Sequence, residues 1–166
     1  MKYSRKRSIY LLHEDRPYYD LWLKLILGGT LAFTLALGII LLPLDMLGAQ
    51  IAFGVTLFDA WLFHAILPRR YQIFEDKIRI VLGYPFAFNI NFSTIKEAKP
   101  ASASKALAYW GIRFATSTKG VVEIIRHKGL NVVISPRNGE TFLENLNQAL
   151  GSFEDYHLDN TSFQKS

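Results

Sequence analysis

The chain has 166 residues, half of them hydrophobic, no cysteine and a formal net charge of +5. Without cysteine it forms no disulfide, no thiolate nucleophile and no cysteine zinc site. Its hydrophobic residues are concentrated in long runs, which argues against a wholly soluble domain.

Residues 1–20 are polar, basic and aromatic, and we interpret them as a cytoplasmic tail with some helix at the membrane surface. A basic segment ahead of an apolar run also begins a secretory signal peptide. Here the apolar run starts only at Leu25 and is longer than a signal-peptide core, so an uncleaved anchor is expected.

Two transmembrane helices are predicted at 25–44 and 46–67, inside a hairpin that covers 21–68. The first stretch has no charged side chain, and the second has only Asp59. About 20 apolar residues at 1.5 Å each span the roughly 30 Å hydrocarbon core of a bilayer. Both stretches are therefore long enough to cross a membrane.

Positive charge lies on one side of this hairpin. The cations that precede the first span are Lys2, Arg5, Lys6, Arg7, Arg16 and Lys24, and those that come after the second are Arg69, Arg70, Lys77 and Arg79. The linker at 43–48 has none. Because cationic flanks stay in the cytoplasm, we expect a multi-pass protein of the cell membrane with both termini cytoplasmic.

Small residues recur at four-residue spacing in both spans. They are Gly28, Ala32 and Ala36 in the first span, and Gly48, Ala52, Thr56 and Ala60 in the second. Small side chains let helix backbones approach closely in lipid. The pattern predicts that these stripes form the contact between the two helices.

Asp59 is costly in this setting, since a mid-membrane carboxylate costs about 2.5–3.5 kcal/mol on insertion scales. In an antiparallel hairpin it lies at the depth of Thr34. One interpretation is a protonated side chain that bonds a threonine hydroxyl or faces an oligomer interface. The other is a proton or ion relay with His64, although a separation of five residues puts these two side chains on different helix faces.

From Arg69 onward the hydrophobic period changes from helical to two, which indicates strands. The expected strands are 71–74, 77–82, 86–92, 95–98, 107–116, 121–127 and 131–134. Their connections are too short for crossovers, so an antiparallel sheet is predicted. Phe86, Phe88, Ile90 and Phe92 are expected to face the core.

One amphipathic helix comes next, with Phe142, Leu146 and Ala149 on its apolar face. Asn138 suits its N-cap and Gly151 its C-terminal end. The predicted domain is therefore 69–151, and residues 152–166 are expected to form a flexible tail.

Three segments of this domain resemble bacterial membrane-anchored pleckstrin-homology-like (PH-like) domains. Residues 70–80 look like their first hairpin, and 92–98 resemble a later strand. Residues 133–143, with Ile134-Ser135-Pro136 before a capped helix, resemble that family most strongly. Gly139 is a departure, because proline is commoner at this position in the family. The resemblance implies a mainly β, PH-like barrel of antiparallel strands with one C-terminal capping helix after the transmembrane hairpin. That family supplies no catalytic residues.

The predicted barrel is basic, and the C-terminal segment after it is acidic. Residues 69–137 carry twelve Lys and Arg against four Asp and Glu, and residues 138–166 carry one Lys against five acids. Near an anionic leaflet each surface cation contributes about 1 kcal/mol. Arg69, Arg70, Lys77 and Arg79 are candidates for an anionic surface or head-group site. Ordinary positive-inside bias is the alternative explanation.

No catalytic, metal or cofactor site is predicted. The four histidines have no metal-ligand spacing, Ser135 lacks the context of a nucleophile, and no nucleic-acid-binding motif is present. The leading hypothesis is a non-enzymatic, membrane-anchored binding or scaffold module whose partners are the lipid bilayer and either anionic head groups or a protein, with homo-oligomers among the expected assemblies. The alternative is an accessory subunit of a membrane transport or export complex, with Asp59 in a shared intramembrane site.

Overall fold

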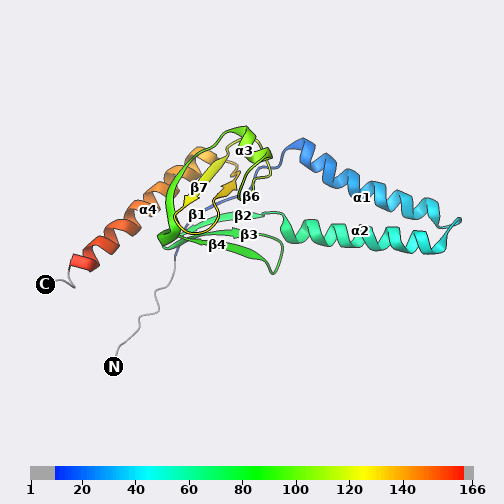
Figure 1. The fold of residues 1–166 in the computed structure, drawn as a ribbon, viewed down its shortest axis with the longest axis horizontal. Coiled ribbons are helices and arrows are strands. Elements are labelled where there is room, and N and C mark those ends of the chain that lie inside the picture. Colours follow the sequence, from blue (N-terminus) through cyan, green and yellow to red (C-terminus); the bar gives the residue numbers. More distant parts are fainter. Residues whose placement is uncertain (1–9, 163–166) are drawn as a thin grey trace, which may run out of the picture.

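The computed structural model describes residues 10–162 and combines a long helical hairpin with a small domain of two sheets and a helix (Figure 1). The basic residues at positions 2, 5, 6 and 7, which carry part of the orientation argument, lie outside the described residues.

The hairpin consists of α1 (Leu21–Leu41) and α2 (Met46–Ile66). Asp45 caps α2, because its carboxylate accepts a hydrogen bond of 3.1 Å from the Leu47 amide. Both helices are long and apolar enough to cross a membrane, and few of their residues are buried. A core helix of a soluble protein would be covered by its own chain. The prediction of two membrane-capable helices is therefore confirmed.

The first sheet contains β1 (Leu11–Asp15), β2 (Arg70–Phe74), β3 (Lys77–Val81) and β4 (Ala87–Asn91), all antiparallel and in this order. β1 differs from expectation, since it comes from the segment interpreted as a tail. It pairs with β2 across the whole hairpin, with Glu14 opposite Gln72. Such a pairing depends on a partner strand more than fifty residues away in sequence, so local patterning does not reveal it.

The second sheet has the order β5-β7-β8-β6. Its strands are β5 (Ile95–Pro100), β6 (Ile112–Phe114), β7 (Val122–Arg126) and β8 (Val132–Ile134). A short 3-10 helix, η1 (Phe92–Thr94), joins the two sheets. The expectation of a purely antiparallel sheet is wrong at one place, because β6 and β8 are parallel.

The parallel pair lies in the region where one strand was expected at 107–116, but only residues 112–114 form a strand. The chain first forms the short helix α3 (Ala103–Leu107), and residues 108–111 then lead into β6. This detour lets β6 enter the sheet at its edge beside β8 and in the same direction. Alternation alone does not distinguish such an edge strand from an antiparallel one.

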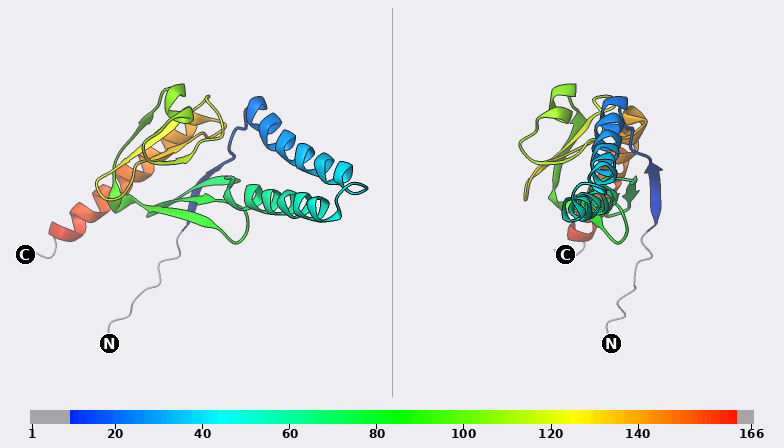
Figure 2. Two further views of the ribbon diagram at one scale, coloured as in Figure 1. Left: turned by 45° about the vertical axis from the view of Figure 1, so that its right-hand side comes forward. Right: turned by 90° about the vertical axis from the view of Figure 1, so that its right-hand side faces the viewer.

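The helix α4 (Gly139–Ser162) covers the open end between the two sheets (Figure 2). It contacts β5, β1 and β2. The core beneath it consists of fully buried side chains, among them Tyr71, Ile73, Ile78, Ile80, Ile90, Val122, Ile124, Val132, Ile134, Phe142 and Leu146. Fold class and core thus agree with a PH-like barrel that comes after a helical hairpin.

The end of α4 was predicted wrongly at Gly151, where the helix continues to Ser162. A glycine inside a helix costs about 1 kcal/mol relative to alanine. The next turn of the helix offsets that cost, because the Phe153 ring packs edge-on against Phe92 at 5.6 Å. Gly139 has a different role. A Cβ there would lie 2.5 Å from the Gly120 carbonyl oxygen, so neither proline nor any larger residue fits.

Candidate functional site

The segment that leads into the hairpin is bonded to the domain along its length. The Asn138 amide donates to an Asp15 carboxylate oxygen at 2.9 Å, and the Tyr18 amide donates to the Ser135 carbonyl at 3.0 Å. The Thr116 hydroxyl in turn donates to the Tyr18 carbonyl at 2.6 Å. Residues 15–18, which lead into α1, are therefore part of the folded domain and do not form a free linker.

Asp20 fastens the start of α1 to the loop between β6 and β7. Its carboxylate accepts from the Ser117 hydroxyl at 2.7 Å, from the Thr118 amide at 2.8 Å and from the Trp22 indole at 3.2 Å. Burial acts to raise the pKa of this carboxyl, but the hydrogen bonds outweigh it and hold the pKa below its usual value. The junction is therefore built around an ionised aspartate.

Tyr19 connects the segment before α1 to the segment after α2. Its hydroxyl donates to the Pro68 carbonyl oxygen at 2.5 Å, directly after α2. Burial raises the pKa of Tyr19 to about 12, against the opposing influence of the Arg69 charge. Because α1 and α2 are each held to the domain and to one another, the domain has a fixed orientation relative to the hairpin.

Two of the four predicted anion-binding cations lie at this junction and already have partners. An Arg69 guanidinium nitrogen lies 2.8 Å from Nδ1 of His64, in the last turn of α2. Arg70 lies on β2 and forms a 3.2 Å ion pair with Glu14 of β1. The imidazole of His64 carries no negative charge and does not neutralise Arg69. The ion pair of Arg70 with Glu14 is solvent-exposed and therefore weak.

The other two cations are on β3, further from the hairpin. Lys77 lies 5.8 Å from the centre of the Phe74 ring, and Arg79 is exposed opposite Gln72. Since a strand rises about 3.3 Å per residue, the Phe74 end of β2 lies about 13 Å further from the hairpin than Arg70 does. The four cations are therefore distributed along the sheet, with Arg79 next to Arg70 diagonally and Lys77 at the end away from the hairpin.

The contact between α1 and α2 uses a different face of α1 from the one predicted. Gly28, Ala32 and Ala36 are exposed, whereas Gly38 is buried. A Cβ on Gly38 would lie 2.8 Å from the Phe53 ring. Residues at four-residue spacing advance 40° around a helix at each step, so such a stripe alone does not define the packed face.

On α2 the prediction is partly right. Ala52 is buried, as is Ala49, while Ala60 is exposed. The Thr56 hydroxyl lies 2.9 Å from the Thr34 hydroxyl of α1. This pair forms a polar contact between the two helices.

Asp59 does not form the threonine hydrogen bond that was expected. Thr34 is paired with Thr56, one turn away from Asp59. The Asp59 side chain is half-buried and has no hydrogen bond or ion pair with any residue between positions 10 and 156. His64 is likewise not brought to Asp59 but bonds Arg69.

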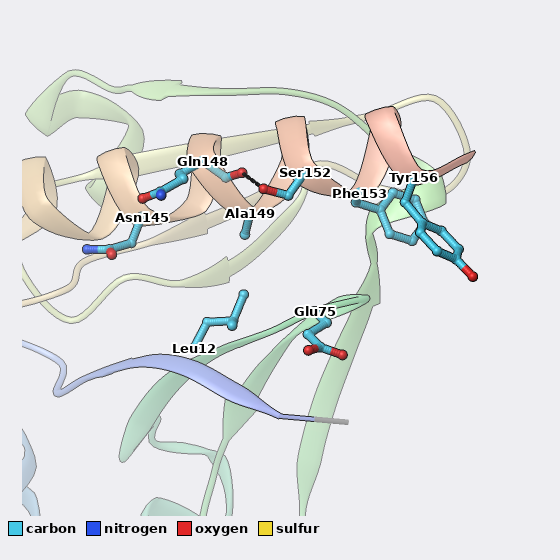
Figure 3. Close-up of a pocket in the computed structure, with 8 residues that line it drawn as sticks. All are labelled: Leu12, Glu75, Asn145, Gln148, Ala149, Ser152, Phe153 and Tyr156. Carbon is cyan, nitrogen blue, oxygen red and sulfur yellow. Dashed lines mark hydrogen bonds between the residues drawn. The ribbon is translucent and has the colours of Figure 1, made fainter. Parts of the chain in front are cut away.

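A groove of about 500 Å³ lies between β1 and the second half of α4 (Figure 3). Leu12 projects from β1 towards the helix, and Glu75 stands at the turn between β2 and β3. Asn145, Gln148 and Phe153 line the opposite wall. Leu12 and Glu75 lie at the Phe74 end of β2, which is the end opposite the junction with α2, so this wall of the groove is at the end of the sheet away from the hairpin. Sequence reasoning missed it because it requires both β1 and the extended α4.

A buried carboxylate in the second sheet was also missed. Glu123 is only 4 % exposed and accepts from Lys105 at 2.6 Å and from the Tyr109 hydroxyl at 2.8 Å. Burial acts to raise the pKa of Glu123, but these two donors lower it below its usual value. The cluster fastens α3 to β7 and leaves the neighbouring Trp110 98 % exposed. Its part in the fold is structural.

Within residues 10–156, no three His, Asp or Glu side chains lie close enough together to hold a metal ion. No curated protein and no solved structure matches the chain. The family model described as "Bacterial PH domain" matches residues 69–149. This match covers β2 to the middle of α4 and agrees with the observed sheets and capping helix. Residues 69–149 form a bacterial PH domain, preceded by a hairpin of two membrane-capable helices.

Proposed function

We propose that this protein is a non-enzymatic, membrane-anchored binding module. The hairpin spans the cell membrane with both termini in the cytoplasm, and the PH domain binds an extended segment of a cytoplasmic partner protein. The groove between β1 and α4 carries this proposal, because its lining residues Leu12 and Glu75 lie at the end of the sheet away from the hairpin, where a cytoplasmic partner would reach them.

The chemistry of the groove supports an extended basic segment. In the part of the chain that the structure describes, β1 pairs with β2 alone, so its outer edge has backbone groups available for another strand. Leu12 offers an apolar contact, while the Glu75 carboxylate in the groove wall provides negative charge. An incoming strand with basic and apolar side chains would satisfy both.

A lipid head-group site is less well supported. Arg69 and Arg70 already have partners, and Lys77 lies at the end of the sheet away from the hairpin. A domain held in fixed orientation cannot turn that end towards the bilayer.

Membrane topology is testable directly because the chain has no cysteine. Leu44→Cys lies in the linker between α1 and α2, and Glu75→Cys in the domain. A membrane-impermeant maleimide added to intact cells should label Leu44→Cys only, and Glu75→Cys should react only after lysis. The reverse labelling would contradict the proposed orientation.

Binding is testable with linear peptides displayed on phage and selected on the full-length protein in nanodiscs. We expect basic, extended peptides to be enriched over empty nanodiscs. Their affinity, measured by fluorescence anisotropy, should fall at least tenfold for Leu12→Asp, and the matched control Lys96→Ala, on β5, should bind normally. If no peptides are enriched, or if they bind Leu12→Asp as tightly as the wild-type protein, the groove is not the binding site and the proposal is refuted. Hydrogen-exchange protection of β2 and β3 that appears only in anionic nanodiscs would favour head groups instead.

A second candidate rests on Asp59. A half-buried carboxylate without a partner inside the hairpin is costly in lipid, so a neighbouring helix of another subunit would supply its missing contact. This would make the protein an accessory subunit of a transport or export complex. Asp59→Asn should then abolish the ion-linked flux of that complex and leave peptide binding in the groove unchanged.

A further inference from the structure

The loop between β3 and β4 presents aromatic side chains to the outside. Tyr84 is 90 % exposed and Phe86 is 46 % exposed. Phe86 was expected to face the core, but β4 begins only at Ala87. The loop itself is closed by hydrogen bonds, from the Leu82 amide to the Phe86 carbonyl at 3.1 Å and from the Phe86 amide to the Gly83 carbonyl at 2.8 Å. Tyr84 is thus held outward on an ordered turn.

This loop lies directly against the end of α2 (Figures 1 and 2). Gly83 packs so closely on His64 that a Cβ at this position would overlap the His64 carbonyl oxygen. Only glycine permits this approach. Since α2 continues to Ile66, the tip of the loop is level with the last turn of a membrane-capable helix.

The same level carries other features of a membrane interface. Trp22 in the first turn of α1 and Trp61 near the end of α2 are both exposed. Arg69 places a cation beside His64. Tyrosine and tryptophan concentrate where hydrocarbon meets head groups, because their rings are apolar and their polar atoms reach water. Exposed aromatic side chains would be unfavourable in water but suit this layer.

We propose that the turn formed by Tyr84, Pro85 and Phe86 inserts into the cytoplasmic head-group layer as a third membrane contact beside the two helices. This inference rests on the membrane placement in the proposed function. It adds the lipid head groups as the binding partner of the turn between β3 and β4. Three contacts define a plane, so the inserted turn sets the tilt of the domain and keeps the groove directed into the cytoplasm.

Fluorescence quenching in nanodiscs tests the insertion. Single cysteines are introduced by Tyr84→Cys, Phe58→Cys in the middle of α2 and Glu75→Cys at the far turn, and each is labelled with an environment-sensitive fluorophore. Lipids carry a nitroxide either near the head group or deep in the acyl chain. The head-group nitroxide should quench the label at position 84 severalfold more than the label at position 75. The nitroxide deep in the acyl chain should quench the label at position 58 more than either of the other two.

The outcomes separate the two proposals. If the label at position 58 is quenched but the label at position 84 is quenched no more than that at position 75, the inserted turn is refuted and the membrane anchor is retained. No quenching at 58 would overturn the membrane anchor, and the insertion with it. As a check without a label, a diazirine-bearing phospholipid should cross-link to the peptide that contains residues 83–86 of the wild-type chain. The absence of that adduct would also refute the insertion.

Discussion

Replacing Asp20 by alanine should open the junction between hairpin and domain. The substitution removes the acceptor of the Ser117 hydroxyl and of the Thr118 amide. The Ser117 hydroxyl is free to turn to water, but the half-buried Thr118 amide is left without an acceptor. An unsatisfied buried amide costs about 1–3 kcal/mol, and a hydrogen bond to a charged acceptor contributes about 1.5–3 kcal/mol. We therefore expect the local opening free energy to fall by about 2–3 kcal/mol.

Hydrogen exchange of the full-length protein in nanodiscs measures this loss. Since 1.4 kcal/mol is a factor of ten, amide exchange at Tyr18 and Thr118 should accelerate by roughly 30-fold or more. Glu144→Ala, at an exposed position of α4, is the control and should leave these amides unchanged. Unaltered exchange at Tyr18 and Thr118 in Asp20→Ala would refute the argument that this carboxylate holds the junction.

The same carboxylate predicts a pH dependence. Its pKa in the folded protein lies below the ordinary value of 3.8. A lowered folded pKa means that the stabilisation is fully present above the unfolded pKa and is lost as the pH falls through the folded pKa. Protection of Tyr18 should therefore be constant above about pH 5 and decrease in acid, and Asp20→Asn should remove this dependence.

Five further substitutions test the packing. Gly38→Leu should disrupt the hairpin, seen as lower thermal stability in detergent, whereas Gly28→Leu should not, because nothing lies within 4 Å of a Cβ there. Gly151→Ala should stabilise the domain by about 1 kcal/mol in denaturant unfolding, whereas Gly139→Ala should destabilise it through the clash with the Gly120 backbone. Asp59→Asn should leave hairpin stability unchanged or slightly raised in the same thermal assay, and a large loss would show that the hairpin itself needs the carboxylate.

The elements that sequence patterns predicted well are those whose signal is local. An uncharged run of 20 residues is sufficient to identify a membrane-capable helix, and alternation is sufficient for β2, β3 and β7. The apolar face of α4, with Phe142 and Leu146, is evident from helical periodicity alone. In each case the signal lies within one element and needs no knowledge of its neighbours.

The errors have a common cause in tertiary contacts. β1 exists because β2 offers it an edge, and β6 is parallel because α3 and the loop after it alter its direction of entry. α4 passes Gly151 because Phe92 lies beneath the next turn. Of the candidate site residues, Lys77 and Arg79 were placed on the correct strand, but their distance from the hairpin depends on how that strand is positioned relative to α2.

The amino-acid sequence by itself determined that this protein has two membrane-capable helices and a barrel closed by one helix, since hydrophobic length and period are properties of contiguous residues. Only the tertiary structure decided how the helical hairpin and the barrel are joined. The Asp20 junction, the turn at Tyr84 against α2 and the groove beside β1 each bring together residues far apart in the chain, and such contacts are selected by three-dimensional packing.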